Sequence, residues 1–305
     1  MKSMNKRINF FAMILSLFLL VTACGTQISK SESDNSRYDA IYSNLVDSES
    51  QEILAVALED AGVQKDFIDV LLESIKKYNY ATGSILPVQS GFEVFTEKSA
   101  SVYDATKLER MWKKKYGNLE GRKNCRITAI EAMSSSISYD ATFQTTEQLM
   151  LVEIADISAF QSDSILEEFK VLFNGIETDE NISPESQVKL INEYWSQAGV
   201  DFHDNDKISL ISIWFNNTDI YGDDDRYVLH CGHAAVLIHT DSDGVLLLEK
   251  LDYNFPYQLI KFPSEKQALR YIVEFNCMET SDSIVVPIVL VGKQLLRIEN
   301  ELPVY

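Results

Sequence analysis

The spacing of apolar and polar residues divides the chain into a helical half and a strand-rich half. In the first half, apolar residues recur three and four positions apart, which predicts helices over residues 48–63, 66–78, 104–116 and 124–135. Between them, residues 87–95 are punctuated by Pro and Gly, so we expect a loop or a short strand there. Residues 147–154 are apolar and fit either a helix or a strand.

In the second half the apolar period shortens. Nearly unbroken apolar runs predict strands over residues 208–215, 234–238, 245–248, 257–262 and 284–291. Asp-Gly at 243–244 predicts a hairpin between two of these strands. Helical spacing returns over residues 165–173, from Ser183-Pro184 onward, and over 264–275. Helices first and mostly antiparallel strands afterwards predict one α+β domain over residues 39–305, helical to about residue 140 and sheet-rich from about 141.

The first residues indicate export. Lys2, Lys6 and Arg7 precede an apolar run that is too short for a comfortable membrane span, which needs roughly 20 residues. The stretch LVTAC, which ends at Cys24, resembles a bacterial lipobox, and this resemblance implies cleavage after residue 23 and a lipid such as palmitate on Cys24. The alternative is an ordinary secretory signal with an incidental cysteine. Residues 24–38 are polar and predict a flexible tether between the anchor and the domain.

Composition and charge limit the classes of partner that the chain is expected to bind. The formal net charge is −19, and the signal segment carries only positive charges, so the rest of the chain is more acidic still. Binding of nucleic acid requires clustered Lys and Arg, and we therefore expect no such partner. An anionic membrane would repel the acidic domain, so a lipid on Cys24 would have to hold it there. We expect a monomer with no cofactor.

Cysteine provides the first candidate for chemistry. Apart from Cys24 the chain has Cys125, Cys231 and Cys277, an odd number in an exported protein, and no C-x-x-C pair. Asn124 is a favoured N-cap residue, which places Cys125 in the first turn of a helix, where the helix dipole favours a thiolate. Neighbouring basic residues act in the same direction: Arg122, Lys123 and Arg126. The alternative is a buried, inert cysteine.

A thiolate that transfers acyl groups needs a histidine as proton shuttle. His203 lies in a polar loop and His239 precedes a turn, whereas His233 follows Gly232 at the start of a buried strand in HCGHAAVLI. Gly at that point lets a substrate or another backbone come close. His233 is therefore the candidate base, and a purely structural histidine is the alternative. A metal site is not favoured, because in a regular strand His230 and His233 face opposite sides.

The histidine needs an orienting group from a neighbouring strand. After the Asp-Gly turn, VLLLEKLD brings acidic residues back towards the level of His233, and the candidates are Glu249 and Asp252, with Asn254 as a third. Glu249 ends an apolar run, where a charge must be paired or exposed. An oxyanion donor would come from Asn118, from the backbone N–H of Cys125, or from the cleft around Asn124. The alternative for each polar residue is a solvated position at the end of a strand.

The order Cys, Gly-His, acid resembles the papain-like thiol fold, which bacterial cell-wall peptidases and transglutaminase-like domains share. More closely, YSNLVDSESQ, NCRITA, GHAAVLI and DGVLLLEKLD resemble a Gram-positive lipoprotein family of unknown function over residues 42–291. The first resemblance implies hydrolysis or transfer at an amide or ester carbonyl, and the expected surface location suggests cell-wall peptides as substrates. The second resemblance implies where the protein is located and which residues form the domain, but it implies no reaction.

Two rival functions remain open on the sequence alone. The same scaffold could bind a partner without turnover, in which case Cys125 and His233 would lie apart. A thiol redox protein would instead require Cys125 to approach Cys231 or Cys277 closely enough for a disulfide.

Overall fold

The helices match the spacing of apolar residues in the sequence. A computed structural model describes residues 38–296 except 97–98, 100–101, 146–148, 150, 204–205, 219–225, 242–243, 277, 280–283 and 286. Its α-helices are α2 (Ser48–Asp60), α3 (Lys65–Thr82), α4 (Ala105–Tyr116), α5 (Cys125–Met133), α6 (Asp163–Phe173), α7 (Pro184–Gln197) and α8 (Glu265–Asn276). In the ambiguous stretch 147–154, residues 147, 148 and 150 lie outside the described residues, and its end enters a 3-10 turn, η4 (Val152–Ala155), which a second one, η5 (Ile157–Ala159), follows.

The strands form one large sheet and two small ones. Across the described residues the large sheet has the order β13-β12-β6-β7-β8-β9-β1-β2, with β4 paired to β7. Its bounds are β1 (Ile41–Ser43), β2 (Glu93–Val94), β4 (Ile176–Thr178), β6 (Ile208–Thr218), β7 (Tyr227–His239), β8 (Val245–Lys250), β9 (Tyr257–Phe262), β12 (Ile288–Val291) and β13 (Gln294–Leu295). The small sheets pair β3 (Ile137–Ser138) with β5 (Asp201–Phe202) and β10 (Met278–Glu279) with β11 (Ile284–Val285).

The predicted α+β class is confirmed. Strand pairs in the large sheet are antiparallel, and most of the helices precede its central strands in the chain. The strand predicted over 257–262 has those bounds, and the predicted hairpin joins β7 to β8. The strand predicted over 234–238 is much longer, because β7 begins at Tyr227 and also pairs with β4. The run 284–291 divides between β11 and β12.

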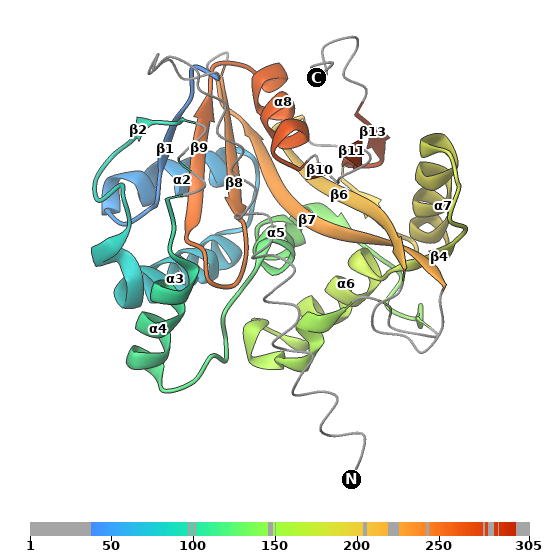
Figure 1. Cartoon of the computed structure of the whole chain (residues 1–305), viewed down its shortest axis with the longest axis horizontal. Coiled ribbons are helices and arrows are strands. Elements are labelled where there is room, and N and C mark those ends of the chain that lie inside the picture. Colours follow the sequence, from blue (N-terminus) through green and yellow to red (C-terminus); the bar gives the residue numbers. More distant parts are fainter. Residues whose placement is uncertain are drawn as a thin grey trace.

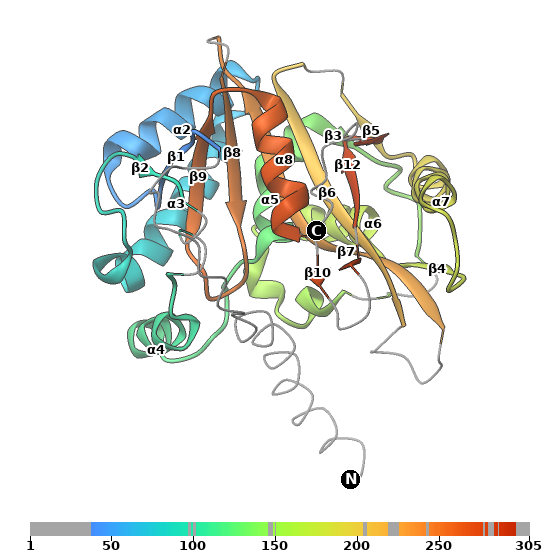
Figure 2. The ribbon, with the colours of Figure 1, turned by 45° about the horizontal axis from the view of Figure 1, so that its top comes forward.

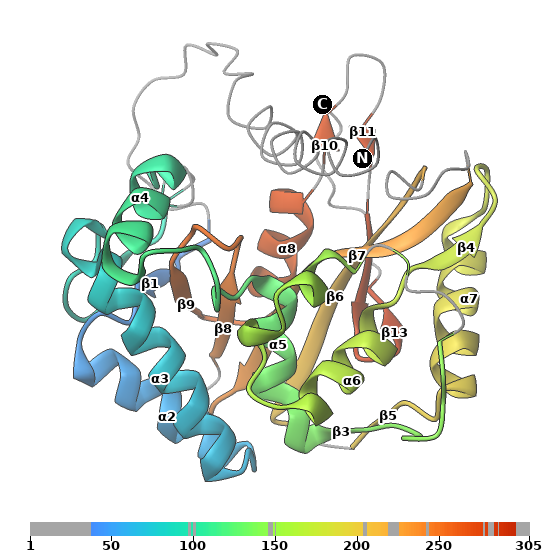
Figure 3. The same cartoon turned by 90° about the horizontal axis from the view of Figure 1, so that it is seen from below.

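Helices cover both faces of the sheet. One set of alternating strand residues, including Leu210, Trp214 and Val236, packs with α2 to α7 in the larger core. The opposite set, including Ile211 and Leu237, packs with α8 in a second core. In Figures 1 and 2, α8 crosses the face of the sheet that is turned to the viewer, and from below α5 lies between α3 and α6 (Figure 3). The helix that bears Cys125 is therefore central.

The sheet divides between β7 and β8. Their pairing runs from His239↔Val245 to Ala235↔Glu249. Beyond that point β7 continues along β6 as far as Tyr227, while β8 continues along β9 to Lys250. The two strands separate visibly, and α5 occupies the gap (Figure 1). We call this point the fork, defined by the last pair, Ala235 and Glu249.

The N-terminal end of the described chain lies next to the expected anchor and tether. The expected signal, residues 1–23, and Cys24 lie outside the described residues. Tyr38, the last residue of the expected tether, is buried, and its ring packs edge-on against Phe262 and Tyr271. Of the helices in the part of the chain that the structure describes, none is long and apolar enough to cross a membrane.

One buried carboxyl group makes the stability depend on pH. Glu168 on α6 is buried, its Oε1 has no hydrogen-bond partner among the described residues, and burial raises its pKa to about 8. Between pH 4.5 and about 8 the folded state therefore holds a proton that the unfolded state releases, so the free energy of unfolding falls as pH rises through this window.

We expect Glu168→Gln to remove this dependence, because the amide stays neutral. Relative to wild type, the variant gains roughly 1–3 kcal/mol at pH 8 and little at pH 4.5, measured by denaturant unfolding at both pH values. Glu167→Gln is the matched control, since Glu167 is the exposed neighbour that pairs with Lys170. Equal effects of the two substitutions at pH 8 would contradict the assignment.

Candidate active site

Cys125 is the first residue of α5, at the fork. The side chain of Asn124 caps the helix by accepting a hydrogen bond from the N–H of Ile127 at 3.1 Å. The predicted cap is therefore present. Every residue of α5 is buried, and Cys125 itself is only 5% exposed. The start of this helix is therefore not open to solvent: the sulfur is enclosed, 4.0 Å from the carbonyl oxygen of Gly232.

The basic residues around Cys125 are held by other partners. Arg126 donates from Nε and Nη2 to the two carboxylate oxygens of Glu153, at 2.7 and 2.6 Å. Lys123 donates to Glu131 at 2.6 Å. Arg122 donates to the side chain of Asn254. The positive charges next to the thiol in the sequence are therefore largely compensated by partners of their own.

A β-bulge at Gly232 sets the direction of His233. Cys231 pairs with Trp214 and His233 pairs with Ile213, so Gly232 is an extra residue in β7. A Cβ at this position would lie 2.7 Å from the ring of Phe215, which is closer than real contacts allow. The bulge turns His233 to the face of Ile213 and Cys231 to the face of Trp214. In a regular strand Cys231 and His233, two residues apart, would face the same side, and the bulge places them on opposite sides.

His233 and Glu249 meet at the fork. Nε2 of His233 lies 3.2 Å from Oε2 of Glu249, and the other carboxylate oxygen accepts a hydrogen bond from the Tyr271 hydroxyl at 2.6 Å. His233 is 6% exposed and Glu249 is 1% exposed. Because Nε2 faces the carboxylate, Nδ1 is the ring nitrogen left for the Cys125 sulfur, which acts electrostatically on the imidazole. Strands β7 and β8 and helices α5 and α8 thus supply one chain of contacts.

The charge state of His233 follows from these partners. Burial alone lowers the pKa of the imidazole, but the neighbouring Cys125 sulfur and then Glu249 outweigh it and raise the pKa to about 10. These neighbours hold the imidazole in its protonated form. Chemically, this arrangement can stabilise a sulfur anion and deliver a proton.

The other sequence candidates lie elsewhere. Asp252 accepts from the N–H of Tyr253 at 2.6 Å, and burial raises its pKa; its backbone oxygen accepts from Lys250. Asn254 is tied to Arg122 and, at 3.3 Å, to Glu109. In the described part of the chain neither makes a hydrogen bond or ion pair with His233, whereas Glu249 does.

The asparagines considered as oxyanion donors are engaged by other groups. Asn118 is exposed, and its amide donates to Glu120 at 2.8 Å in the loop after α4. The amide of Asn124 donates to Glu153 at 2.6 Å while its oxygen caps α5. The backbone N–H of Cys125 remains, because N–H groups in the first turn of a helix have no acceptor within the helix.

The thiols and the histidines do not form a disulfide or a metal site in the described part of the chain. Cys125 and Cys231 are both free and buried, and Cys277 lies outside the described residues. Burial raises the pKa of Cys231 to about 12. Among the residues that the structure describes, no group of three or more His, Cys, Asp or Glu could hold a metal ion.

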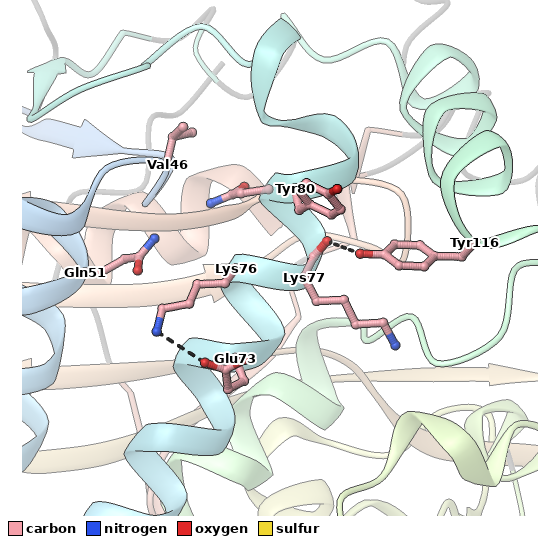
Figure 4. Close-up of a pocket in the computed structure, with 8 residues that line it drawn as sticks. Val46, Gln51, Glu73, Lys76, Lys77, Tyr80 and Tyr116 are labelled. Carbon is pink, nitrogen blue, oxygen red and sulfur yellow. Dashed lines mark hydrogen bonds and ion pairs between the residues drawn. The ribbon is translucent and has the colours of Figure 1, made fainter.

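Two hollows lie along α3, each of about 550 Å³. The first is lined by α2, α3 and Tyr116 and is shown in Figure 4. The second lies on the other side of Lys77, between α3 and the segment that leads into α5. Its wall includes Lys123, two residues before Cys125, and Lys250, one residue after Glu249. Cys125 and His233 themselves line neither hollow.

Three residues of this region were not found from the sequence. Tyr271 contacts Glu249 across the sheet, and no local pattern marks it. Glu153 pairs with Arg126, and here a signal was available, because a lone carboxylate in the apolar run LMLVEI needs a buried partner. Lys250 is fully buried, and its ammonium donates to the backbone oxygens of the loop that follows it.

These features define a class: an α+β domain with a buried Cys-His-Glu arrangement at the fork of an antiparallel sheet. The chain belongs to the family described as a domain of unknown function, DUF4300, which matches residues 41–296. The comparison with curated proteins and the comparison with solved structures find no match. The family match agrees with the extent inferred from the sequence motifs.

We expect the hydroxyl of Tyr271 to contribute measurably to the free energy of unfolding. We expect Tyr271→Phe to cost about 1–3 kcal/mol in the free energy of unfolding, because it leaves a buried carboxylate oxygen of Glu249 without its donor. Urea denaturation measures this. Tyr116→Phe is the control, since the Tyr116 hydroxyl donates to the exposed carbonyl of Lys77 and its loss should cost under about 0.5 kcal/mol. Similar losses in both variants would contradict a special role for the Glu249 contact.

Proposed function

We propose that this protein is a lipid-anchored thiol enzyme of papain-like architecture that hydrolyses or transfers acyl groups at amide or ester carbonyls. One observation carries the proposal: His233 lies 3.2 Å from the carboxylate of Glu249, and the Cys125 sulfur at the start of α5 is close enough to raise the pKa of its imidazole. Cys125 is the nucleophile, His233 the general acid and base, and Glu249 the orienting group.

The reaction follows from these positions. The Cys125 thiolate attacks the carbonyl carbon, and the backbone N–H of Cys125 donates to the oxyanion. The His233 imidazolium gives its proton to the leaving nitrogen or oxygen as that bond breaks, which leaves a thioester. Water, or an acceptor amine, then gives a proton to His233 and attacks the thioester, which releases the acyl product and restores the thiolate.

The location of the proposed substrate follows from the expected anchor. A lipid on Cys24 would hold the domain at the outer face of the cell membrane, close to cell-wall peptides, which are therefore the proposed substrates. The acidic surface would be repelled by anionic lipids, so attachment would depend on the acyl chain and not on charge.

A binding protein without turnover is the second candidate, and the enclosure of the site favours it. Cys125 and His233 are 5% and 6% exposed, so a substrate reaches the sulfur only if neighbouring groups move. The reactivity of the thiol distinguishes the two functions, because a catalytic thiolate must react with a small electrophile.

We expect Cys125 to be alkylated rapidly by iodoacetamide at pH 6. An ordinary thiol, with a pKa of about 8.5, is less than about 1% ionised there. His233→Ala should slow the reaction on the order of 10- to 100-fold, since it removes the cation that stabilises the thiolate. The rates are measured on the soluble domain by mass spectrometry across pH 5–10.

Two controls belong to this experiment. Cys231 should stay unmodified in the folded protein, because burial raises its pKa to about 12. His239→Ala removes a second histidine that also lies 3.2 Å from a glutamate, Glu265, and it should leave the rate at Cys125 unchanged. A wild-type Cys125 that remains as inert as Cys231 would overturn the enzyme and favour the binding protein.

The lipid anchor is tested separately. We expect wild-type protein to fractionate with membranes and to incorporate labelled palmitate, and Cys24→Ser to abolish both, because the thiol that carries the lipid is gone. Cys125→Ser is the matched control and should remain lipidated. Membrane association and labelling that survive Cys24→Ser would contradict the anchor.

A further inference from the structure

The hollow between α3 and the segment before α5 has a cationic interior in an acidic protein. Among the described residues, the cations on its wall are Lys77, Arg122, Lys123 and Lys250, and the carboxylates are Asp69 and Glu73. Both carboxylates lie on the exposed face of α3 and are already paired with lysines of that helix, Lys65 and Lys76. The balance of charge inside the hollow therefore favours the binding of an anion.

The cations differ in what they can offer a ligand. Lys123 is paired with Glu131, and Arg122 is held by Asn254 with Glu109 at 3.9 Å. The Lys250 ammonium donates to three backbone oxygens, which uses all of its N–H groups. Burial also lowers the pKa of Lys250, so this residue adds only a weakened positive potential and no free donor.

Lys77 is the exception. Its ammonium lies over the rings of Trp112 and Tyr116, at 5.5 and 5.4 Å, and it has no carboxylate partner within the described residues. Figure 4 shows the neighbouring Lys76 reaching Glu73, while the side chain of Lys77 extends away from this pair on the side of Tyr116. Its N–H groups are thus free to donate to a ligand.

Trp112 supplies an independent observation. It is 3% exposed and lines the hollow, yet its indole Nε1 has no hydrogen-bond acceptor in the part of the chain that the structure describes. A buried N–H without an acceptor is costly and rare in folded proteins. The Nε1 atom itself has almost no accessible surface, so an oxygen ligand in the hollow would supply this acceptor after a shift of the ring, over which the ammonium of Lys77 lies.

We propose that this hollow is the subsite for a carboxylate of the substrate, held by Lys77 and the indole N–H of Trp112. The inference rests on the proposed function, and it names the substrate class: acidic peptides or acyl compounds that carry a free carboxylate near the scissile bond. The aromatic rings of Tyr78, Trp112 and Tyr257 line the same hollow and would pack against the apolar part of such a substrate.

The hollow adjoins segments that carry the thiol site, although Cys125 and His233 do not line it. Lys123 and Lys250 on its wall are close in sequence to Cys125 and Glu249, and the Cys125 sulfur contributes to the electrostatic environment of Lys250. Elsewhere the strongly negative protein repels anions, so a local cationic hollow would also guide such a substrate.

Matched pairs of alkylating probes test the subsite. N-bromoacetyl derivatives of glycine, 4-aminobutyric acid and 6-aminohexanoic acid each carry a free carboxylate at a different reach, and the primary amide of each is its neutral partner. The rate of alkylation at Cys125 is measured for every acid and its amide in the full soluble domain. We expect at least one spacer length to favour the acid.

The variants show whether the preference comes from the hollow. Lys77→Gln should lower the acid-to-amide ratio about five- to tenfold, as expected for one lost charge-assisted hydrogen bond in a partly solvated site. Trp112→Phe keeps a ring but removes the N–H and should lower the ratio in the same direction. Lys114→Gln, which removes an exposed lysine of α4 outside the hollow, should leave the ratio unchanged.

The outcomes separate this inference from the proposed function. If the neutral amides alkylate Cys125 quickly but no spacer gives a ratio that depends on Lys77, the thiol enzyme stands and the carboxylate subsite is wrong. If Lys77→Gln and Lys114→Gln lower the ratio equally, the preference reflects net charge, and the subsite is again wrong. If no probe reacts at Cys125, the proposed function itself fails.

Discussion

The separation of β7 from β8 is the constraint on which the site depends. A continuous sheet would have left no room for a helix end between the two strands. Because pairing stops at Ala235↔Glu249, the start of α5 enters the gap and brings Cys125 to the edge of β7. His233, two residues beyond the last pair, can then face Glu249 on one side and the sulfur on the other.

Such a fork exposes polar groups in a region that is otherwise apolar, and the chain compensates each of them. Arg126 is neutralised by Glu153 and Lys123 by Glu131, so these charges stabilise the start of α5 and do not activate the thiol directly. Removing one partner of either buried pair would leave an uncompensated buried charge. The free energy lost in this way exceeds the net stabilisation that the intact pair contributes. His233 is thus the cation that the structure directs at Cys125.

Features that depend on neighbouring residues in the chain could be predicted from the sequence, whereas contacts between distant segments could not. Asn124 as a helix cap and Pro184 at the start of α7 were predicted because these residues act within one helical turn. The bulge at Gly232 could not be predicted, since an extra residue in β7 is defined only by its partners in β6. For the same reason Tyr271 was missed: its contact with Glu249 links residues on α8 and β8 across the second core.

One strand connects the candidate thiol site with the cationic hollow. Successive residues of a strand face opposite sides of the sheet, so Glu249 points towards Tyr271 on α8 while Lys250 points towards Tyr78 on α3, 4.4 Å from its ring. Lys250 also fixes the loop after β8 through the backbone oxygens of Asp252, Tyr253 and Phe255. A ligand that shifts Lys250 would therefore act on the backbone that carries Glu249, and through Glu249 on the orientation of His233. The candidate thiol site and the hollow thus share one segment of β8, whose two successive side chains face opposite sides of the sheet.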